Sequence, residues 1–183
     1  MDNWRTLRSE VVFEHPVLRV NRVLRQKPSG RSHEFVVLDS SDWVNLVPIT
    51  PEGEVVLIRQ WRQGSQETTL EIPGGIVDPG ETPQVAGARE LREETGYQAA
   101  SLTFLGWVRP NPALFNNRCF TFLAAGARPA GPPSPEPNEE IEVLTRPLAE
   151  IPGLIQCGEI THSLVVTAFT FLWLAQAEQG IAW

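Results

Sequence analysis

The chain has 183 residues, of which 42% are hydrophobic and 20% charged, as is usual for a globular domain. A formal net charge of −7 without a basic patch argues against a nucleic-acid partner. The first residues lack the basic and apolar regions of a signal peptide, and the longest apolar run, 164–177, is too short to cross a bilayer. We therefore expect a soluble, cytoplasmic protein with no membrane partner, in which Cys119 and Cys157 are free, buried thiols.

The first part of the chain has the pattern of an antiparallel β meander. Strand-like runs occur at 10–13, 18–24 and 34–38, and the second of them alternates apolar and polar residues. Pro28, Ser29 and Gly30 predict a turn between the second and third runs. We expect one domain, 1–183, in which 1–42 is an N-terminal β layer and 43–183 is the main body.

Two further strands are expected at 43–49 and 54–58, joined as a hairpin by the turn 50–53. In the segment that follows, Arg59 and Arg62 flank Trp61. Two guanidinium groups beside an indole can bind a phosphate next to a stacking surface for a base. The alternative is an exposed strand end with the indole packed in the core.

A glycine-rich connection then leads into a helix. Thr82 is placed as its N-cap and Pro83 at its first position, while Gly96 is placed to end it. Within this helix Glu90, Glu93 and Glu94 share one face, where like charges repel one another. A divalent cation would neutralise them, and hard oxygen ligands suit Mg²⁺ or Mn²⁺. A solvated acidic face is the alternative.

The rest of the chain continues the α/β pattern. Strands are expected at 102–108 and 119–125, a polar loop at 109–118, an extended mobile loop at 128–138, and helices at 147–156 and 163–179. An acidic pair, Glu139 and Glu140, follows the proline-rich loop. His162 is expected to cap the last helix rather than to reach a site.

The segment 75–97 resembles the signature of Nudix hydrolases, G-x5-E-x7-R-E-U-x-E-E-x-G-U, where U is a bulky apolar residue. The fixed positions are filled by Gly75, Glu81, Arg89, Glu90, Leu91, Glu93, Glu94 and Gly96, and Tyr97 replaces the final apolar residue. The resemblance implies a Nudix-type α/β/α sandwich with a mixed sheet. Pro112, sixteen residues beyond Gly96, is similar in position to a proline that marks the ADP-ribose and sugar-nucleotide branch of the family.

The resemblance also implies roles for individual residues. Glu90 and Glu94, with the Gly74 carbonyl, would hold Mg²⁺, and Glu93 would serve a second ion, with two or three ions in all. Arg89 and Glu81 would orient these carboxylates. The late acidic loop would supply the catalytic base or an extra metal ligand, a role that we assign to Glu139, with Glu140 as the second candidate.

Candidate substrate contacts are Arg62, Trp61 and Glu71, by similarity to the family's Q-x-R segment, and Asn116, Asn117 and Arg118 in the polar loop. For the last three, a turn without a ligand is an equal alternative. The N-terminal layer resembles one that forms a homodimer in related enzymes, so we expect a homodimer.

The predicted activity is metal-dependent hydrolysis of a nucleotide sugar, such as ADP-ribose or another ADP- or GDP-sugar, to a nucleoside monophosphate and a sugar phosphate. If the protein is an enzyme, the alternative substrates are nucleoside triphosphates and dinucleoside polyphosphates. If the protein is not an enzyme, the first alternative is a sensor that binds a nucleotide sugar without turnover. An acidic structural protein is the most distant alternative.

Overall fold

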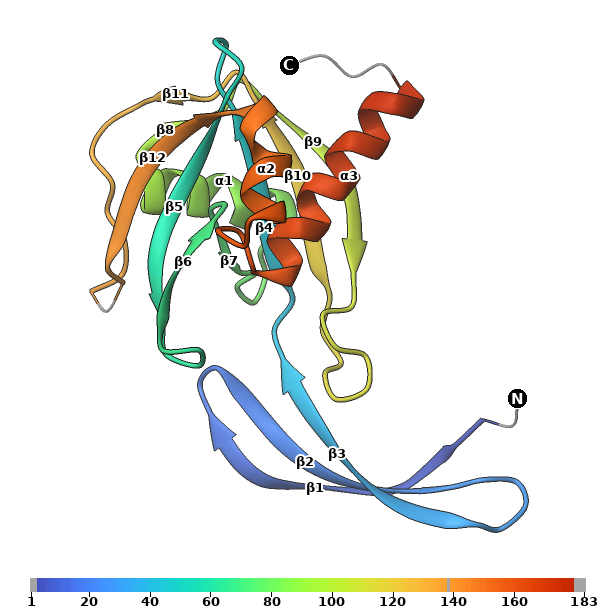
Figure 1. Ribbon diagram of the computed structural model, residues 1–183. Helices are drawn as coiled ribbons and strands as arrows, with labels where there is room; N and C mark the ends of the chain where they lie inside the picture. The colour runs from blue at the N-terminus through green and yellow to red at the C-terminus, as the bar shows by residue number, and fades with distance from the viewer. Residues whose placement is uncertain (1–2, 138, 180–183) are drawn as a thin grey trace. The chain divides into compact units, whose positions relative to one another are not determined.

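The structure, a computed structural model, describes residues 3–137 and 139–179 (Figure 1). The chain divides into two compact units, which we describe separately. The first comprises Met1–Asp42 and Val108–Arg118, and the second comprises Trp43–Trp107 and Cys119–Trp183. The segment 108–118 was expected to be part of the main body, but it groups with the N-terminal strands because it pairs with the third of them.

The first unit is the predicted antiparallel meander. Its strands are β1 (Arg5–His15), β2 (Leu18–Gln26) and β3 (Ser32–Ser40), in that order. The Leu38 N–H on β3 donates to the Leu114 carbonyl at 2.8 Å, which fixes the loop 108–118 to the sheet. On β1, Val11, Val12 and Phe13 are 46–56% exposed, so this strand presents apolar side chains at the surface of the unit.

The second unit contains a mixed sheet that is seven-stranded within the described residues. The strands are β4 (Trp43–Ile49), β5 (Glu54–Arg62), β6 (Glu67–Glu71), β7 (Gly74–Ile76), β9 (Ser101–Val108), β10 (Cys119–Ala125) and β12 (Ile141–Pro147). β10 is parallel to β4, whereas β12 and β6 are antiparallel to β5. The expected β4–β5 hairpin is paired directly only at Ile49 and Val55, because farther along β4 pairs with β7 instead.

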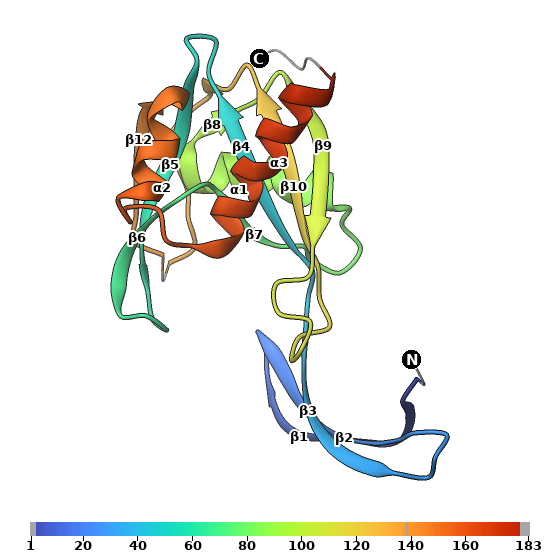
Figure 2. The same ribbon diagram turned by 45° about the vertical axis from the view of Figure 1, so that its right-hand side comes forward.

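Helices cover both faces of this sheet (Figures 1 and 2). They are α1 (Pro83–Thr95), α2 (Ile151–Gln156), which follows a 3₁₀ turn at Leu148–Glu150, and α3 (Ser163–Gln179). Side chains alternate along β4, so that Val44 and Leu46 pack with α1 while Val47 and Ile49 pack with α3. Both helix layers are therefore held by apolar burial, and the predicted α/β/α sandwich is confirmed. No helix in the described part of the chain has the length and apolar character needed to cross a membrane.

The local signals at the ends of α1 are confirmed. The Thr82 hydroxyl accepts from the Val85 N–H at 3.3 Å, and Gly96 has φ of 73°, the left-handed conformation that favours glycine. The proline-rich loop, expected to be mobile, is fixed to this helix end. The Ala130 N–H donates to the Gly96 carbonyl at 2.8 Å, and the Ser134 N–H donates to the Glu93 carbonyl at 2.7 Å.

Between these contacts, β11 (Arg128–Pro129) pairs with β8 (Tyr97–Gln98). One cysteine expectation is wrong. Cys119 is buried as expected, but Cys157 is exposed because it lies at the C-terminal end of α2.

Candidate active site

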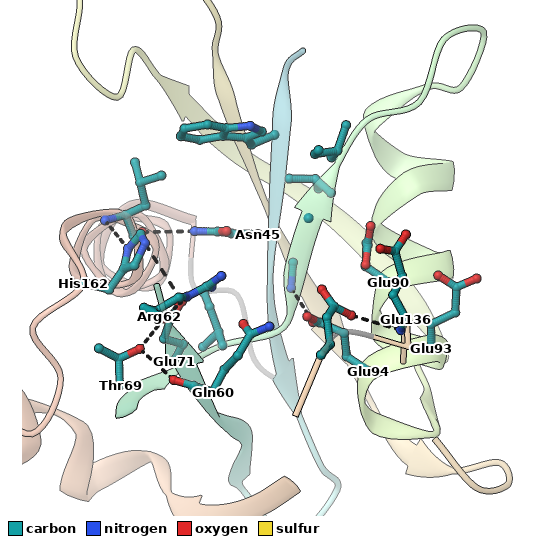
Figure 3. A pocket seen from close by; sticks show the side chains of 18 of the residues that line it. Asn45, Gln60, Arg62, Thr69, Glu71, Glu90, Glu93, Glu94, Glu136 and His162 are labelled. Atoms are coloured by element: carbon teal, nitrogen blue, oxygen red, sulfur yellow. Dashed lines mark hydrogen bonds and ion pairs between the residues drawn. The ribbon is translucent and has the colours of Figure 1, made fainter. Parts of the chain in front are cut away.

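A cavity of about 720 Å³ opens in the second unit (Figure 3). Its walls come from β4 and β7, from the paired strands β5 and β6, from α1, and from the segments that precede β12 and α3. One end is acidic and is formed mainly by α1. The other end combines an arginine, a buried carboxylate and a histidine.

Arg89 organises the acidic end. Its guanidinium donates to both oxygens of Glu81 at 3.2 and 3.1 Å, to Glu90 at 2.9 Å and to Glu93 at 3.0 Å. These hydrogen bonds hold the pKa of Glu81 below its usual value. With the glutamates drawn onto Arg89 in this way, the described residues contain no group of three or more acidic, histidine or cysteine side chains already arranged around a metal position.

Glu94 differs from the glutamates that bond to Arg89, because within the described residues its carboxylate has no arginine bonded to it. It is 2% exposed, and its oxygen accepts the Gly74 N–H at 2.8 Å. Burial raises its pKa to about 8, against the effect of the Gly74 hydrogen bond, and the neighbouring carboxylates of Glu90 and Glu139 add to the rise. Glu94 is therefore a buried acid that, within the described residues, has no bonded cation to stabilise its ionised form.

Glu90 lies over the same strand as Glu94. A Cβ added to Gly75 would be 2.4 Å from the Glu90 Oε1, so only glycine allows this approach. Burial also raises the pKa of Glu90, although Arg89 opposes the rise. The carboxylates of Glu90 and Glu94 thus lie over Gly74 and Gly75 and are partly shielded from water. Mg²⁺ and Mn²⁺ prefer hard oxygen ligands of this kind, so these residues fit a divalent cation.

A second group of acids comes from the segment before β12. Glu139 lines the cavity, and its Oε2 accepts the main-chain N–H of Glu136 at 3.2 Å. Glu136 lines the cavity as well, close to the carboxylates of α1 (Figure 3). Glu140 is exposed and does not line the cavity. The geometry therefore brings Glu139, rather than Glu140, to the acidic end.

At the opposite end, Arg62 and Glu71 form a bidentate ion pair with two contacts of 2.7 Å. Glu71 is only 3% exposed, and burial alone would raise its pKa. The hydrogen bonds and the charge of Arg62, together with a hydrogen bond from Thr69 at 2.5 Å, outweigh burial and lower the pKa of Glu71. The His162 Nε2 lies 4.0 Å from the same carboxylate, while its Nδ1 accepts the Leu164 N–H at 3.2 Å. His162 was expected to cap the last helix rather than to reach a site. In the structure it caps α3 and also lines the cavity.

Residues 42–166 match the family model described as the NUDIX domain. The chain belongs to the NUDIX domain family.

Known proteins are similar to this Nudix chain over most of its length. It is 26% identical to the ADP-ribose pyrophosphatase of Bacillus subtilis, with 96% of each chain covered, and 31% identical to the ADP compounds hydrolase NudE of Escherichia coli, with 90% of this chain and 82% of the relative covered. A crystal structure of an ADP compounds hydrolase superposes with a TM-score of 0.87 at 25% identity, covering 98% of this chain and 97% of that chain. The predictions of a Nudix enzyme and of its resemblance to the ADP-ribose pyrophosphatase branch are confirmed.

Of the other predicted substrate contacts of this Nudix enzyme, Trp61 lies on β5 and the remaining three lie in the first unit. Trp61 is 46% exposed and does not line the cavity, because side chains alternate along β5 and Arg62 points the other way. The alternative of a core position for Trp61 is therefore wrong. In the first unit, Asn116 donates to Asp39 at 2.5 Å, Asn117 donates to the Ser41 carbonyl, and Arg118 bonds to Asp42.

Among the cavity residues that were not predicted site residues are Gln60, Glu136 and His162. A usable signal existed for Gln60, since period two along β5 places it on the same face as Arg62. Glu136 and His162 reach the cavity only through the course of their segments in the fold, and no local pattern marks them.

Proposed function

We propose that this Nudix enzyme hydrolyses the diphosphate of a nucleotide sugar similar to ADP-ribose, with release of a nucleoside monophosphate and a sugar phosphate. The observation that supports it best is the pair of carboxylates of Glu94, which is buried, and Glu90, which is partly buried, at one end of a cavity with room for such a ligand. The names of the relatives from Bacillus subtilis and Escherichia coli point to the same class of substrate.

Mg²⁺ or Mn²⁺ is the proposed cofactor. Glu90, Glu94 and the Gly74 carbonyl would hold one ion, and Glu93, which is 40% exposed at the rim, would serve a second. Bound ions would offset the repulsion between the substrate's phosphates and a chain of net charge −7, and would lower the pKa of the attacking water.

The chain's own residues have separate tasks. Glu139 accepts the proton of the water that attacks phosphorus, as the new P–O bond forms and the bridging P–O bond breaks. Arg89 and Glu81 hold the carboxylates of α1 in place through the hydrogen bonds described above. Arg62 is fixed by Glu71 through Nε and Nη2, and its other N–H groups, which have no hydrogen-bond acceptor among the described residues, can donate to the substrate.

A substrate panel tests the activity. With Mg²⁺ in ¹⁸O-labelled water, we expect ADP-ribose and related nucleotide sugars to give a nucleoside monophosphate and a sugar phosphate, with ¹⁸O in one of the two products. Faster release of pyrophosphate from nucleoside triphosphates would contradict this proposal and make nucleoside triphosphates the substrate class. Cleavage of dinucleoside polyphosphates alone would make those the substrate class. Tight binding of ADP-ribose without turnover would favour the sensor.

We also propose that the chain forms a homodimer through its first unit. The exposed apolar side chains of β1, including Val11 and Phe13, are of the kind that interfaces bury. Light scattering should give twice the mass of the chain, 20.4 kDa. Replacing both residues with Lys should shift the protein to a monomer, whereas a wild-type monomer would contradict the proposal.

A further inference from the structure

Gln60 has an unusual position in the cavity. It lies on β5, is 6% exposed and contributes to the wall, and Figure 3 shows its amide between the Arg62–Glu71 pair and Glu94. Its side-chain Oε1 is buried and accepts no hydrogen bond from any residue that the structure describes. Native proteins rarely leave a buried oxygen in this state, so a partner from outside the chain is expected.

The polar neighbours of Gln60 hydrogen-bond to other groups, and none of those that the structure describes donates to its Oε1. Thr69, directly opposite on β6, donates its hydroxyl hydrogen to Glu71, and its only contact with Gln60 is to the main-chain carbonyl at 3.4 Å. Arg62 donates twice to Glu71, and the Asn45 amide donates to the Leu164 carbonyl at 3.3 Å. The buried Oε1 of Gln60, on a residue that lines the cavity, is therefore left without a donor among the described residues.

The chemistry of this oxygen limits what can bind it. An acceptor needs a donor, and the ionised oxygens of a diphosphate can only accept, so the partner must carry an O–H or N–H group. This step depends on the proposed function, which places the diphosphate at Glu90 and Glu94. In a nucleotide sugar the sugars are attached directly to the diphosphate, whereas the base lies one sugar farther away. Sugar hydroxyls are therefore the donors nearest to Gln60.

We infer that the Gln60 Oε1 accepts a hydrogen bond from a sugar hydroxyl of the substrate, which makes Gln60 a residue that determines specificity for hydroxylated sugars. A site built to bond a hydroxyl discriminates strongly against the analogue that lacks it, because the buried partner is then left unpaired. The hydroxyl belongs either to the nucleoside ribose or to the distal sugar, and single-deoxy substrates distinguish the two.

The test compares wild type and Gln60→Met on ADP-ribose and on analogues that each lack one hydroxyl of one ribose. For wild type, removal of the bonded hydroxyl should raise KM about tenfold or more. Gln60→Met should raise KM for ADP-ribose by about the same factor, with kcat little changed, and should no longer distinguish that analogue from the parent. The analogue that shows this loss identifies which sugar is bonded.

Two further variants keep the result interpretable. Gln84→Met, an exposed glutamine on α1 outside the cavity, should leave KM unchanged. Gln60→Asn retains an amide but withdraws the oxygen by one methylene, so it should lose the same discrimination. The melting temperature of Gln60→Met should not fall, because the substitution removes a buried acceptor without a partner.

Several outcomes would overturn the inference. If wild type hydrolyses ADP-ribose but Gln60→Met keeps its KM and its discrimination, the oxygen is satisfied by water and only this inference fails. If Gln60→Met instead loses discrimination between adenine and hypoxanthine, the donor is the amine of the base. If wild type cleaves no nucleotide sugar, the proposed function fails together with this inference.

Discussion

Replacing Glu94 with Gln should lower kcat for the preferred nucleotide sugar by a factor of about one hundred or more in Mg²⁺. The substitution preserves the shape of the side chain and can keep the hydrogen bond from the Gly74 N–H through its amide oxygen. What it removes is a buried group that can ionise to bind a cation and that no arginine in the described part of the chain binds directly. In the proposed function that group is a cation ligand, so its loss should weaken Mg²⁺ binding and turnover together.

Steady-state kinetics over a Mg²⁺ titration measure this effect. Glu142→Gln is a matched control, since Glu142 is an exposed glutamate on β12 that pairs with Arg59 at 3.5 Å outside the cavity. The control should retain wild-type activity. If Glu94→Gln were equally active at every Mg²⁺ concentration, Glu94 would not be a cation ligand.

The same variant should change how stability depends on pH. In the metal-free folded chain Glu94 keeps its proton up to a pKa of about 8, whereas in the unfolded chain it loses the proton near its usual value of 4.5. Between these values the folded state binds more protons, so the contribution of Glu94 to stability is lost as pH rises. The melting temperature of Glu94→Gln should therefore fall less than that of wild type between pH 5 and pH 8. Mg²⁺ should stabilise wild type more at pH 8 than at pH 5, because it competes with the proton.

Replacing Glu139 with Gln should lower kcat by about one hundredfold while leaving KM within a few fold of wild type. In the proposed function, the carboxylate accepts a proton in the transition state, and the amide cannot do so. The segment that carries Glu139 is fixed to α1 by main-chain hydrogen bonds at Gly96 and Glu93, which do not involve the substituted side chain. The effect should therefore be on the chemical step rather than on folding.

Parallel variants identify which carboxylate acts as the base. Glu159→Gln, an exposed glutamate in the turn after α2, should behave as wild type. A large loss of rate in Glu140→Gln alone would move the assignment by one residue. The same loss in Glu136→Gln alone would assign the base to the glutamate that donates its main-chain N–H to Glu139.

Sequence alone predicted those parts of the fold that local chemistry decides. Thr82 and Gly96 mark the two ends of α1 because a cap needs only neighbouring atoms, and both are where they were expected. The strands of the N-terminal meander followed from apolar runs and one turn. The β4–β5 pairing was only partly correct, since β7 takes the place of β5 beside Trp43, Val44 and Asn45. That insertion is a long-range event that no local pattern reveals.

The part of the acidic half that α1 forms was predictable because its glutamates share one helical face with fixed spacing. The other half was not, since it requires β5, β6 and the turn before α3 to meet. Gln60 became notable only when burial left its oxygen without a partner, and His162 only when its second nitrogen was found 4.0 Å from Glu71. Arg89 was expected to orient carboxylates, but its simultaneous bonds to Glu81, Glu90 and Glu93 are visible only in three dimensions.

The most direct test is a crystal structure with Mn²⁺, which the anomalous signal locates. We expect at least one Mn²⁺ bound by the carboxylates of Glu90 and Glu94, with Arg89 remaining on Glu81. A structure at saturating Mn²⁺ in which no ion binds these side chains, and Glu90 and Glu93 remain on Arg89, would contradict the proposal that this helical face serves to bind cations.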